Sequence, residues 1–315
     1  MKRSAILCVL FILSVPSWAF GLPNDVATSW LKIPTSAREA AMGGAFGAVP
    51  GDLEALGVNP AGLAGMENPE AGLMQPFWAQ GLSFQHLAYG QPLSPDSGGA
   101  LGADFIDFGQ VEKTIISGGV PVADGTFTPF ALNLYAGYGL RVTDDLSFGG
   151  TVKVLYQDLD RPTATLALDA GLLWRPRGNG LSLGWVFSNL GGTLDQASLP
   201  LQMKAAAAYR IRLDRMSGHG LDSKDPGSLL TLAVDGDLSL HDTGFSNLRL
   251  GGEYWFHGLV AVRAGYRFAP YGDLTGVAGL ALGAGLHYQK WELDYALTTQ
   301  GDMGSTNQIS LMTRF

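Results

Sequence analysis

Residues 229–241 read LLTLAVDGDLSLH, and two kinds of side chain alternate along this stretch. Apolar Leu230 and Val234 occupy one parity, whereas Asp235 and Asp237 occupy the other, together with the polar and small residues. Successive side chains of a β-strand point to opposite faces of a sheet, so a period of two predicts a strand with one apolar face. The stretch therefore predicts antiparallel β structure.

The same alternation recurs along most of the chain. Counting back from Phe315, eleven such segments reach residue 130, and the stretch 70–119 has room for three or four more, with 82–92 and 99–108 as the best candidates. Bacterial single-chain barrels have an even number of strands, so the sequence predicts about fourteen, with twelve as the alternative. The segments from residue 130 onward are 130–141, 146–157, 164–174, 181–189, 201–213, 229–241, 246–256, 259–268, 277–288, 291–298 and the strand that ends the chain.

An alternating strand can belong to a soluble sandwich or to a membrane barrel, and three features favour the barrel. Aromatic residues such as Tyr138 and Trp291 lie near the ends of the apolar faces, as expected of an interfacial girdle. The chain also closes on an alternating strand with a terminal aromatic residue, the signal that outer-membrane barrels present to their assembly machinery. The residues of this expected assembly signal are Ile309, Leu311 and Phe315.

The third feature is the opposite face, which mixes glycine and alanine with charges of both signs. Such a mixture suits a crowded lumen, where small residues leave room and ion pairs neutralise one another. The charged residues expected to line the lumen are Lys153, Asp169, Lys204, Arg210, Asp235, Asp237, Arg249, Glu253, Arg263, Arg267, Glu292 and Asp294.

The overall composition agrees with a barrel. Glycine accounts for 44 of the 315 residues, while only 15% of residues are charged and the formal net charge is -8. Soluble domains carry about 25% charged residues, so this chain is poor in charge. The acidic balance, with no Lys/Arg cluster beyond Arg3, argues against a nucleic-acid partner.

The first nineteen residues have the three parts of a secretory signal peptide. Lys2 and Arg3 are followed by an apolar run from Ala5 to Val15 and by the small-x-small site at residues 17–19. Segment 1–19 is therefore expected to be removed on export. The only cysteine of the chain lies inside it, so no thiol chemistry is expected of the mature protein.

The residues after the signal peptide do not alternate. Ser36 and Glu39 have the spacing of a capping box, Gly43 and Gly44 would end the short helix, and Asn59 precedes a proline. A short helix followed by a Gly/Pro-punctuated loop cannot be a spanning strand. We therefore expect residues 20–69 to form a hatch that folds into the lumen of the barrel at 70–315, with a flexible periplasmic tail as the alternative.

The same segment resembles a known family. Ser36-Ala37-Arg38-Glu39-Ala40-Ala41-Met42-Gly43-Gly44-Ala45, followed by Asn59-Pro60-Ala61-Gly62-Leu63, is similar to the leader of FadL-like outer-membrane proteins, most of all the PorV/PorQ branch. Residues 250–254, 262–266 and 301–311 resemble that branch as well. The resemblance implies a fourteen-stranded barrel with an N-terminal hatch. The hatch motif comprises Ser36, Arg38, Met42, Gly43, Gly44, Asn59, Pro60, Ala61, Gly62 and Leu63.

The resemblance implies two alternative functions. The first is passage of hydrophobic small molecules across the outer membrane through a plugged barrel. The second is docking of secreted protein cargo in a secretion system of the type IX kind. The low Lys and Asn content suggests a GC-rich genome, unlike those in which that system is best known, and this weighs weakly against docking. The external loops look shorter than those of FadL transporters, so the loop-built capture site of those proteins is not carried over.

Enzymatic activity is not expected. The five histidines are scattered, and none has the spacing of a catalytic triad or of a metal site. The sequence therefore predicts a non-enzymatic protein without cofactor or metal, located in the outer membrane of a Gram-negative-type bacterium. Its expected partners are outer-membrane lipid, the barrel assembly machinery and either a hydrophobic small molecule or a secreted protein.

One connection departs from the expected pattern of short periplasmic turns. The turns at 143–145, 175–180, 257–258 and 289–290 fall on the periplasmic side if the C-terminus does. The long polar connection 214–228 falls on that side too, so it is either an unrecognised hairpin or a periplasmic interaction loop.

Overall fold

The computed structural model describes residues 28–78, 82–195, 197–213, 227–240, 244–268, 278–301 and 304–315. The predicted signal peptide and most of the 214–228 connection lie outside the described residues. Among the residues that are described, no helix is long and apolar enough to cross a membrane.

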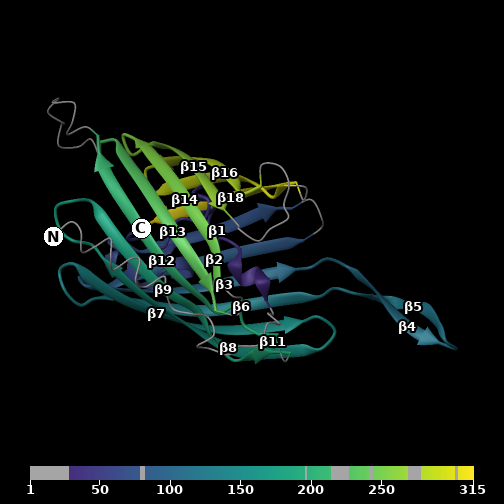
Figure 1. The fold of residues 1–315 in the computed structure, drawn as a ribbon. Helices are drawn as coiled ribbons and strands as arrows, with labels where there is room; N and C mark the ends of the chain where they lie inside the picture. The colour runs from purple at the N-terminus through teal and green to yellow at the C-terminus, as the bar shows by residue number, and fades with distance from the viewer. Residues whose placement is uncertain are drawn as a thin grey trace.

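The strands form one closed antiparallel barrel of fourteen strands, which confirms the predicted fold and excludes the twelve-strand alternative (Figure 1). Around the ring the order is β1, β18, β17, β16, β15, β14, β13, β12, β9, β8, β7, β6, β3 and β2. The strands are β1 (Glu70–Phe77), β2 (Ser83–Ser94), β3 (Ser97–Asp107), β6 (Phe130–Arg141), β7 (Leu146–Asp158), β8 (Pro162–Trp174), β9 (Leu181–Gly191), β12 (Gln202–Arg212), β13 (Leu229–Ser239), β14 (Gly244–Phe256), β15 (Val260–Phe268), β16 (Leu280–Tyr288), β17 (Trp291–Thr299) and β18 (Ser305–Arg314).

The ring closes between the first and the last strand, where Glu70 pairs with Arg314 and Phe77 with Asn307. The start of β1 and the end of β18 therefore share one rim, and the short turns 257–259 and 289–290 lie at the same rim. Short turns face the periplasm in outer-membrane barrels and longer loops face outward, which orients the molecule.

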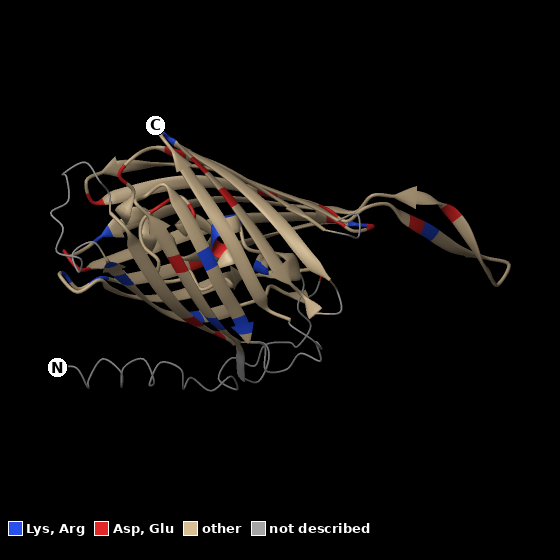
Figure 2. Cartoon of the chain, turned by 90° about the horizontal axis from the view of Figure 1, so that it is seen from above, with Lys and Arg blue, Asp and Glu red and all other residues tan. Residues whose placement is uncertain are grey.

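Alternation along the strands separates a lipid-facing wall from a filled lumen. In β17, Glu292 and Asp294 are buried, whereas Leu293 and Tyr295 are exposed on the outer surface. Figure 2 shows that acidic and basic residues occupy neighbouring strands of the barrel. Apolar residues outside and polar residues inside are the arrangement of an outer-membrane barrel.

Two small hairpins stand apart from the ring. β4 (Val111–Ser117) and β5 (Val120–Phe127) form a two-stranded sheet that projects well beyond the rim between β3 and β6 (Figure 1). The second hairpin, β10 (Thr193–Leu194) and β11 (Ala197–Ser198), belongs to the connection between β9 and β12. The sequence singled out neither hairpin: β4 lies at the end of the stretch 70–119, where further strands were expected but 82–92 and 99–108 were the best candidates, and β10 and β11 lie between two predicted strands.

The N-terminal segment lies inside the ring (Figure 1, purple). It consists of η2 (Ser29–Lys32), α2 (Ala37–Ala41), α3 (Ala55–Val58) and η3 (Pro60–Gly65), joined by turns. Every residue of α2 is buried, although the helix has only five residues. A helix this short is not stable by itself in water, so its contacts with the barrel wall hold it in place. We refer to residues 28–66 as the plug.

Candidate functional site

The first turns of the plug are set by local hydrogen bonds. The hydroxyl of Ser36 caps α2 by accepting from the backbone N–H of Glu39 at 3.0 Å. The Glu39 carboxylate accepts from the N–H of Thr35 at 3.1 Å instead of completing a capping box with Ser36. Gly43 and Gly44 follow with φ of 66° and 79°, in the left-handed region that glycine adopts without strain.

The second half of the motif is ordered by one amide side chain. Asn59 is extended and caps η3, its Oδ1 accepting from the N–H of Ala61 at 3.2 Å. Its Nδ2 donates to the carbonyl of Gly47 at 2.7 Å and to that of Leu172 on β8 at 3.2 Å. Asn59 thus joins two parts of the plug to the wall, and Pro60 begins the following helical turn.

Glycines on the inner wall let the plug backbone approach closely. A Cβ atom on Gly149 of β7 would lie 2.2 Å from the backbone N of Ala61, and one on Gly265 of β15 would lie 2.2 Å from the N of Gly43. A Cβ atom added to Gly171 would lie 2.1 Å from Asn59 Oδ1, and one added to Gly251 would lie 2.6 Å from the Met42 carbonyl oxygen. The glycine excess of the sequence is therefore partly a docking surface for the plug.

Apolar side chains of the plug fill the remaining space in two clusters. Met42 and Phe46 are fully buried against small wall residues, among them Ala206 and Ala233. Leu53, Leu56 and Leu63 form the second cluster, with Tyr135 and Met312 on the wall. Met42 and Leu63 of the predicted hatch motif thus serve as core residues between plug and barrel.

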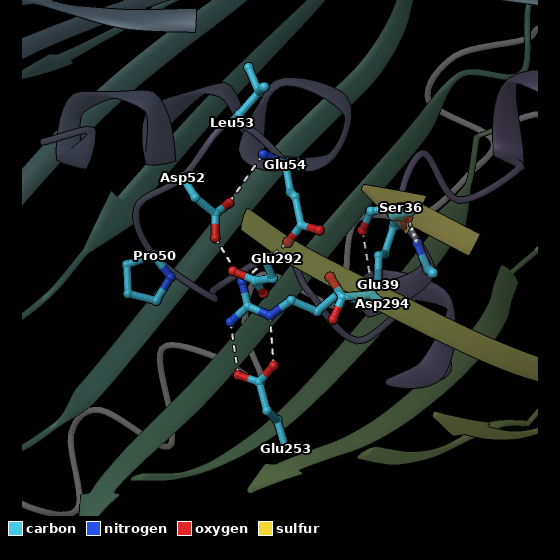
Figure 3. A network of polar contacts seen from close by, with 12 residues as sticks. Ser36, Glu39, Pro50, Asp52, Leu53, Glu54, Glu253, Glu292 and Asp294 are labelled. Atoms are coloured by element: carbon cyan, nitrogen blue, oxygen red, sulfur yellow. Dashed lines mark hydrogen bonds and ion pairs between the residues drawn. The ribbon is translucent and has the colours of Figure 1, made fainter. Parts of the chain in front are cut away.

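Arg38 is the main electrostatic link between plug and wall. Its guanidinium donates from Nε and Nη2 to the two carboxylate oxygens of Glu253 on β14, at 2.6 and 2.8 Å. Its Nη1 reaches Asp52 at 2.7 Å and Glu54 at 3.1 Å, both within the plug. Figure 3 shows Glu253 facing Asp52 and Glu54 across this link. The guanidinium also stacks 5.1 Å from the ring of Phe46.

The network continues along the wall toward the periplasmic rim. Arg263 donates to Glu253 at 2.7 Å and to Asp294, and its Nη2 lies 3.7 Å from Glu292. Arg314, near the end of β18, pairs with Glu292 and Glu70, each at 3.0 Å. We refer to these residues, together with Arg38, Asp52 and Glu54, as the Arg38 network.

Burial shifts the pKa of two acidic groups in the plug, Glu39 and Glu54. Burial raises the pKa of Glu39, and Lys204 and the Thr35 amide oppose the rise. Burial and the neighbouring Asp52 raise the pKa of Glu54 well above its ordinary value, although Arg38 opposes this. For Arg38 burial alone would lower the pKa, but Glu253, Glu54 and Asp52 outweigh it and raise the pKa.

A second set of wall charges holds the middle of the plug. Asp235 accepts from the backbone N–H groups of Phe46 and Gly47 at 3.0 and 2.8 Å, and Lys204 lies 3.6 Å away. Arg249 pairs with Asp237 at 2.6 Å on the neighbouring strand. Asp235 and Asp237, both expected to line the lumen, thus lie among basic partners and plug amides.

The remaining charges expected in the lumen fall into separate places. Lys153 pairs with Asp169 at 2.7 Å and donates to Asn189 at 3.0 Å, and all three residues are buried. Arg210 donates to the carbonyl of Pro50 at 3.0 Å, and Arg267 lines a cavity on the outer side of the plug. The predicted lumen residues therefore do not form one cluster.

Sequence reasoning missed several functional partners. Asp52, Glu54 and Glu70 lie outside the alternating segments, so nothing marked them as partners of arginines. A polar group on β2, β3 and β6 was also missed: Asp104 accepts from Tyr135 at 3.1 Å and lies 2.7 Å from His86 Nδ1. The buried parity of β3 was the only signal that could have pointed to Asp104.

The predicted assembly-signal residues lie at the closing strand. Ile309 is exposed on the outer wall, and Leu311 follows it on the same face of β18. Phe315 comes after the strand, is exposed, and donates its N–H to the carbonyl of Pro69 at 2.9 Å. The described part of the chain contains no cluster of three His, Cys, Asp or Glu side chains that could hold a metal ion.

On the outer side of the plug lies a cavity of about 250 Å³. Ile33 and Pro34 of the plug and Trp78 after β1 give it an apolar wall, and Lys32, Arg249 and Arg267 give it a basic one. We refer to it as the outer cavity. It opens above α2, so the plug separates it from the periplasmic rim.

No protein-family model matches this sequence. No curated protein matches it either. Solved structures do share the fold. The Pseudomonas putida toluene transporter TodX is 14% identical with a TM-score of 0.59, over 88% of this chain and 96% of that chain.

Two further solved structures agree with this likeness. The Ralstonia pickettii toluene transporter TbuX is 14% identical with a TM-score of 0.55, over 89% of this chain and 98% of that chain. A Pseudomonas aeruginosa FadL homologue is 13% identical with a TM-score of 0.53, over 89% and 98%. At such identities the likeness shows the fold, which is that of the FadL-like outer-membrane barrels.

Proposed function

We propose that this barrel mediates the passage of hydrophobic small molecules across the outer membrane. The observation that carries the proposal is the outer cavity, which lies above a plug whose apolar side chains pack against the inner wall. An open aqueous pore needs no such cavity, whereas a transporter must first bind its ligand on the outer side. The similar solved structures are named as toluene transporters and as monoaromatic hydrocarbon channels, which supports the same assignment.

The plug must then move, or the wall must open, for a ligand to leave the outer cavity. The glycine contacts and the Arg38 network hold residues 36–66 at many points of the wall. In the first segment of the plug, Trp30 and Leu31 pack against apolar clusters of the wall.

An uptake assay in cells with an intact outer membrane tests transport. Cells that produce the protein should take up a labelled monoaromatic hydrocarbon faster than cells that lack it. Ile33→Asp places a carboxylate in the apolar wall of the outer cavity and should lower the rate several-fold. Val142→Asp introduces the same charge on an exposed turn and serves as the matched control. Equal uptake with and without the protein would refute transport.

We also propose membership of the PorV/PorQ branch. The support is the leader sequence, Ser36 to Ala45 followed by Asn59 to Leu63, together with the place of these residues in the contact between plug and wall. Comparing the leader sequences of PorV-type barrels with those of other FadL-like barrels would test the assignment. A leader that all FadL-like barrels share equally would contradict it.

Docking of exported proteins is a second candidate, and the β4–β5 hairpin favours it. The hairpin projects beyond the outer rim and exposes Ile115, Ile116 and Val120 near its tip. Deletion of residues 111–127 should release a surface-held protein from the cells and leave hydrocarbon uptake unchanged. If the deletion impairs uptake and releases no protein, the docking function is wrong.

A further inference from the structure

Four arginines line a cavity at the periplasmic end of the plug, and two of them, Arg38 and Arg314, are paired with carboxylates. The cavity has a volume of about 400 Å³, and its wall includes Arg175, directly after β8, and Arg210, near the end of β12. Pro50 and Gly65 of the plug border it as well. We refer to it as the periplasmic cavity. It lies on the opposite side of the plug from the outer cavity, so it is a separate site.

The acidic residues of this cavity are mostly engaged by other arginines. Asp52 is paired with Arg38, and Glu70 and Glu292 are paired with Arg314. Glu67, the remaining acidic residue of the lining, is exposed. Within the part of the chain that the structure describes, no carboxylate forms an ion pair with Arg175 or Arg210.

Both guanidinium groups are partly withdrawn from water. Arg210 donates one N–H, from Nη2, to the carbonyl of Pro50 at 3.0 Å, while its buried Nε has no acceptor among the described residues. Burial and the neighbouring Arg141 lower the pKa of Arg175, so its surroundings do not compensate its charge. Burying a cation without a counter-charge costs free energy, and an anion bound in the cavity would recover it.

We propose that the periplasmic cavity binds an oxyanion, a phosphate or carboxylate group, between Arg175 and Arg210. A guanidinium presents a planar fork of N–H donors that matches the two oxygens of such a group. A volume of about 400 Å³ admits a small organic anion as well as inorganic phosphate. The site faces the periplasm, so its ligand comes from that compartment and does not need to pass the plug.

Calorimetric titration of the full chain in detergent tests the site. Inorganic phosphate and succinate are titrated separately into protein kept in sodium chloride of matched ionic strength, which distinguishes the two sources of oxyanion. Saturable binding of at least one probe is expected. Arg175→Gln and Arg210→Gln should each weaken that binding by roughly tenfold or more, since each removes charge-assisted hydrogen bonds.

Two further variants keep the outcome decisive. Arg177→Gln removes an exposed arginine of the same turn, whose partner is Asp144, and should leave the affinity unchanged. Arg210→Lys replaces the Gln variant if that variant fails to fold. It keeps the charge but loses the planar fork, so it should bind the probe more weakly than the wild type does. No saturable binding of either probe, or equal weakening by Arg177→Gln, would overturn the proposal. Neither result depends on hydrocarbon uptake.

Discussion

At the residue scale, the cationic side chain of Arg38 links two carboxylates of the plug to a carboxylate of the wall. Its side chain is 8% exposed and that of Glu253 is 1% exposed, so water screens this pair little. Arg263 shares the Glu253 carboxylate from the wall side. Two cations and several carboxylates thus neutralise one another in a place where any of them alone would be costly.

Replacing Arg38 by methionine should loosen the plug. The change leaves Asp52 and Glu54 without their cation, and breaking a buried ion pair costs about 3–5 kcal/mol. Hydrogen exchange of residues 36–66 should accelerate accordingly. Arg177→Gln is the control, because its pair with Asp144 has side chains 69% and 70% exposed and should contribute little. Unchanged exchange in Arg38→Met would contradict this role.

Glu54 should make the stability of the plug depend on pH. Burial raises its pKa in the folded protein, so its contribution is fully present below the pKa of the unfolded chain and is lost as pH rises through the folded pKa. Protection of the plug, corrected for the intrinsic exchange rate, should therefore fall across that window. Glu54→Gln should flatten the fall; a fall of the same size in the variant would assign the effect to another group.

At the scale of elements, a strand such as β7 combines lipid contact, lumen charge and plug contact. Val152 and Val154 face outward, Lys153 and Thr151 are buried inside, and Gly149 touches the plug. The alternating side chains of β7 therefore contact lipid on one face and the lumen on the other. On the lumen face, Gly149 also contacts the backbone of the plug.

Gly149→Ala should disturb plug docking, whereas Gly150→Ala should not. The added Cβ would lie 2.2 Å from Ala61 N in the first variant and 3.5 Å from the Asp169 carbonyl oxygen in the second. Overpacking of this kind costs typically 1–3 kcal/mol. Limited proteolysis of the plug in folded barrels should show faster cleavage for Gly149→Ala alone. Equal rates for the two neighbours would contradict the docking surface.

Most of the strands could be predicted because each carries its own signal, whereas β1 was covered only by the room left in 70–119. Segment 229–241 alternates visibly, and β13 spans Leu229–Ser239 in the structure. The β4–β5 hairpin carries no such signal, because both of its faces are exposed and no burial selects an apolar parity. Periodicity detects an element through the face that it buries.

At the scale of the whole molecule, the site is made by contacts between distant parts of the chain. Arg38 and Glu253 are 215 residues apart, and Ala37 and Ser310 are 273 apart. The sequence placed Arg38 in a hatch motif and Glu253 in the lumen, but it did not pair them. The ion pair between Arg38 and Glu253 depends on which strand faces the plug and on where along that strand the plug lies. Both follow only from the closure of the barrel and the register of its strands.

We expect the barrel and its plug to form a wall that does not conduct ions. The plug lies between the outer and the periplasmic cavity and is anchored to strands around the ring, including β8, β13, β14 and β18. A molecule on this plan admits a bound ligand without offering a continuous column of water. Closure by residues 28–66 is the central claim.

Ion conductance across a planar lipid bilayer tests that claim most directly. The wild-type protein should show no stable conductance steps, because the plug fills the lumen. A variant that lacks residues 28–66, shown to be a folded barrel by circular dichroism, should produce large and lasting steps. If the wild type conducts as well as the deletion variant, the plug does not close the barrel.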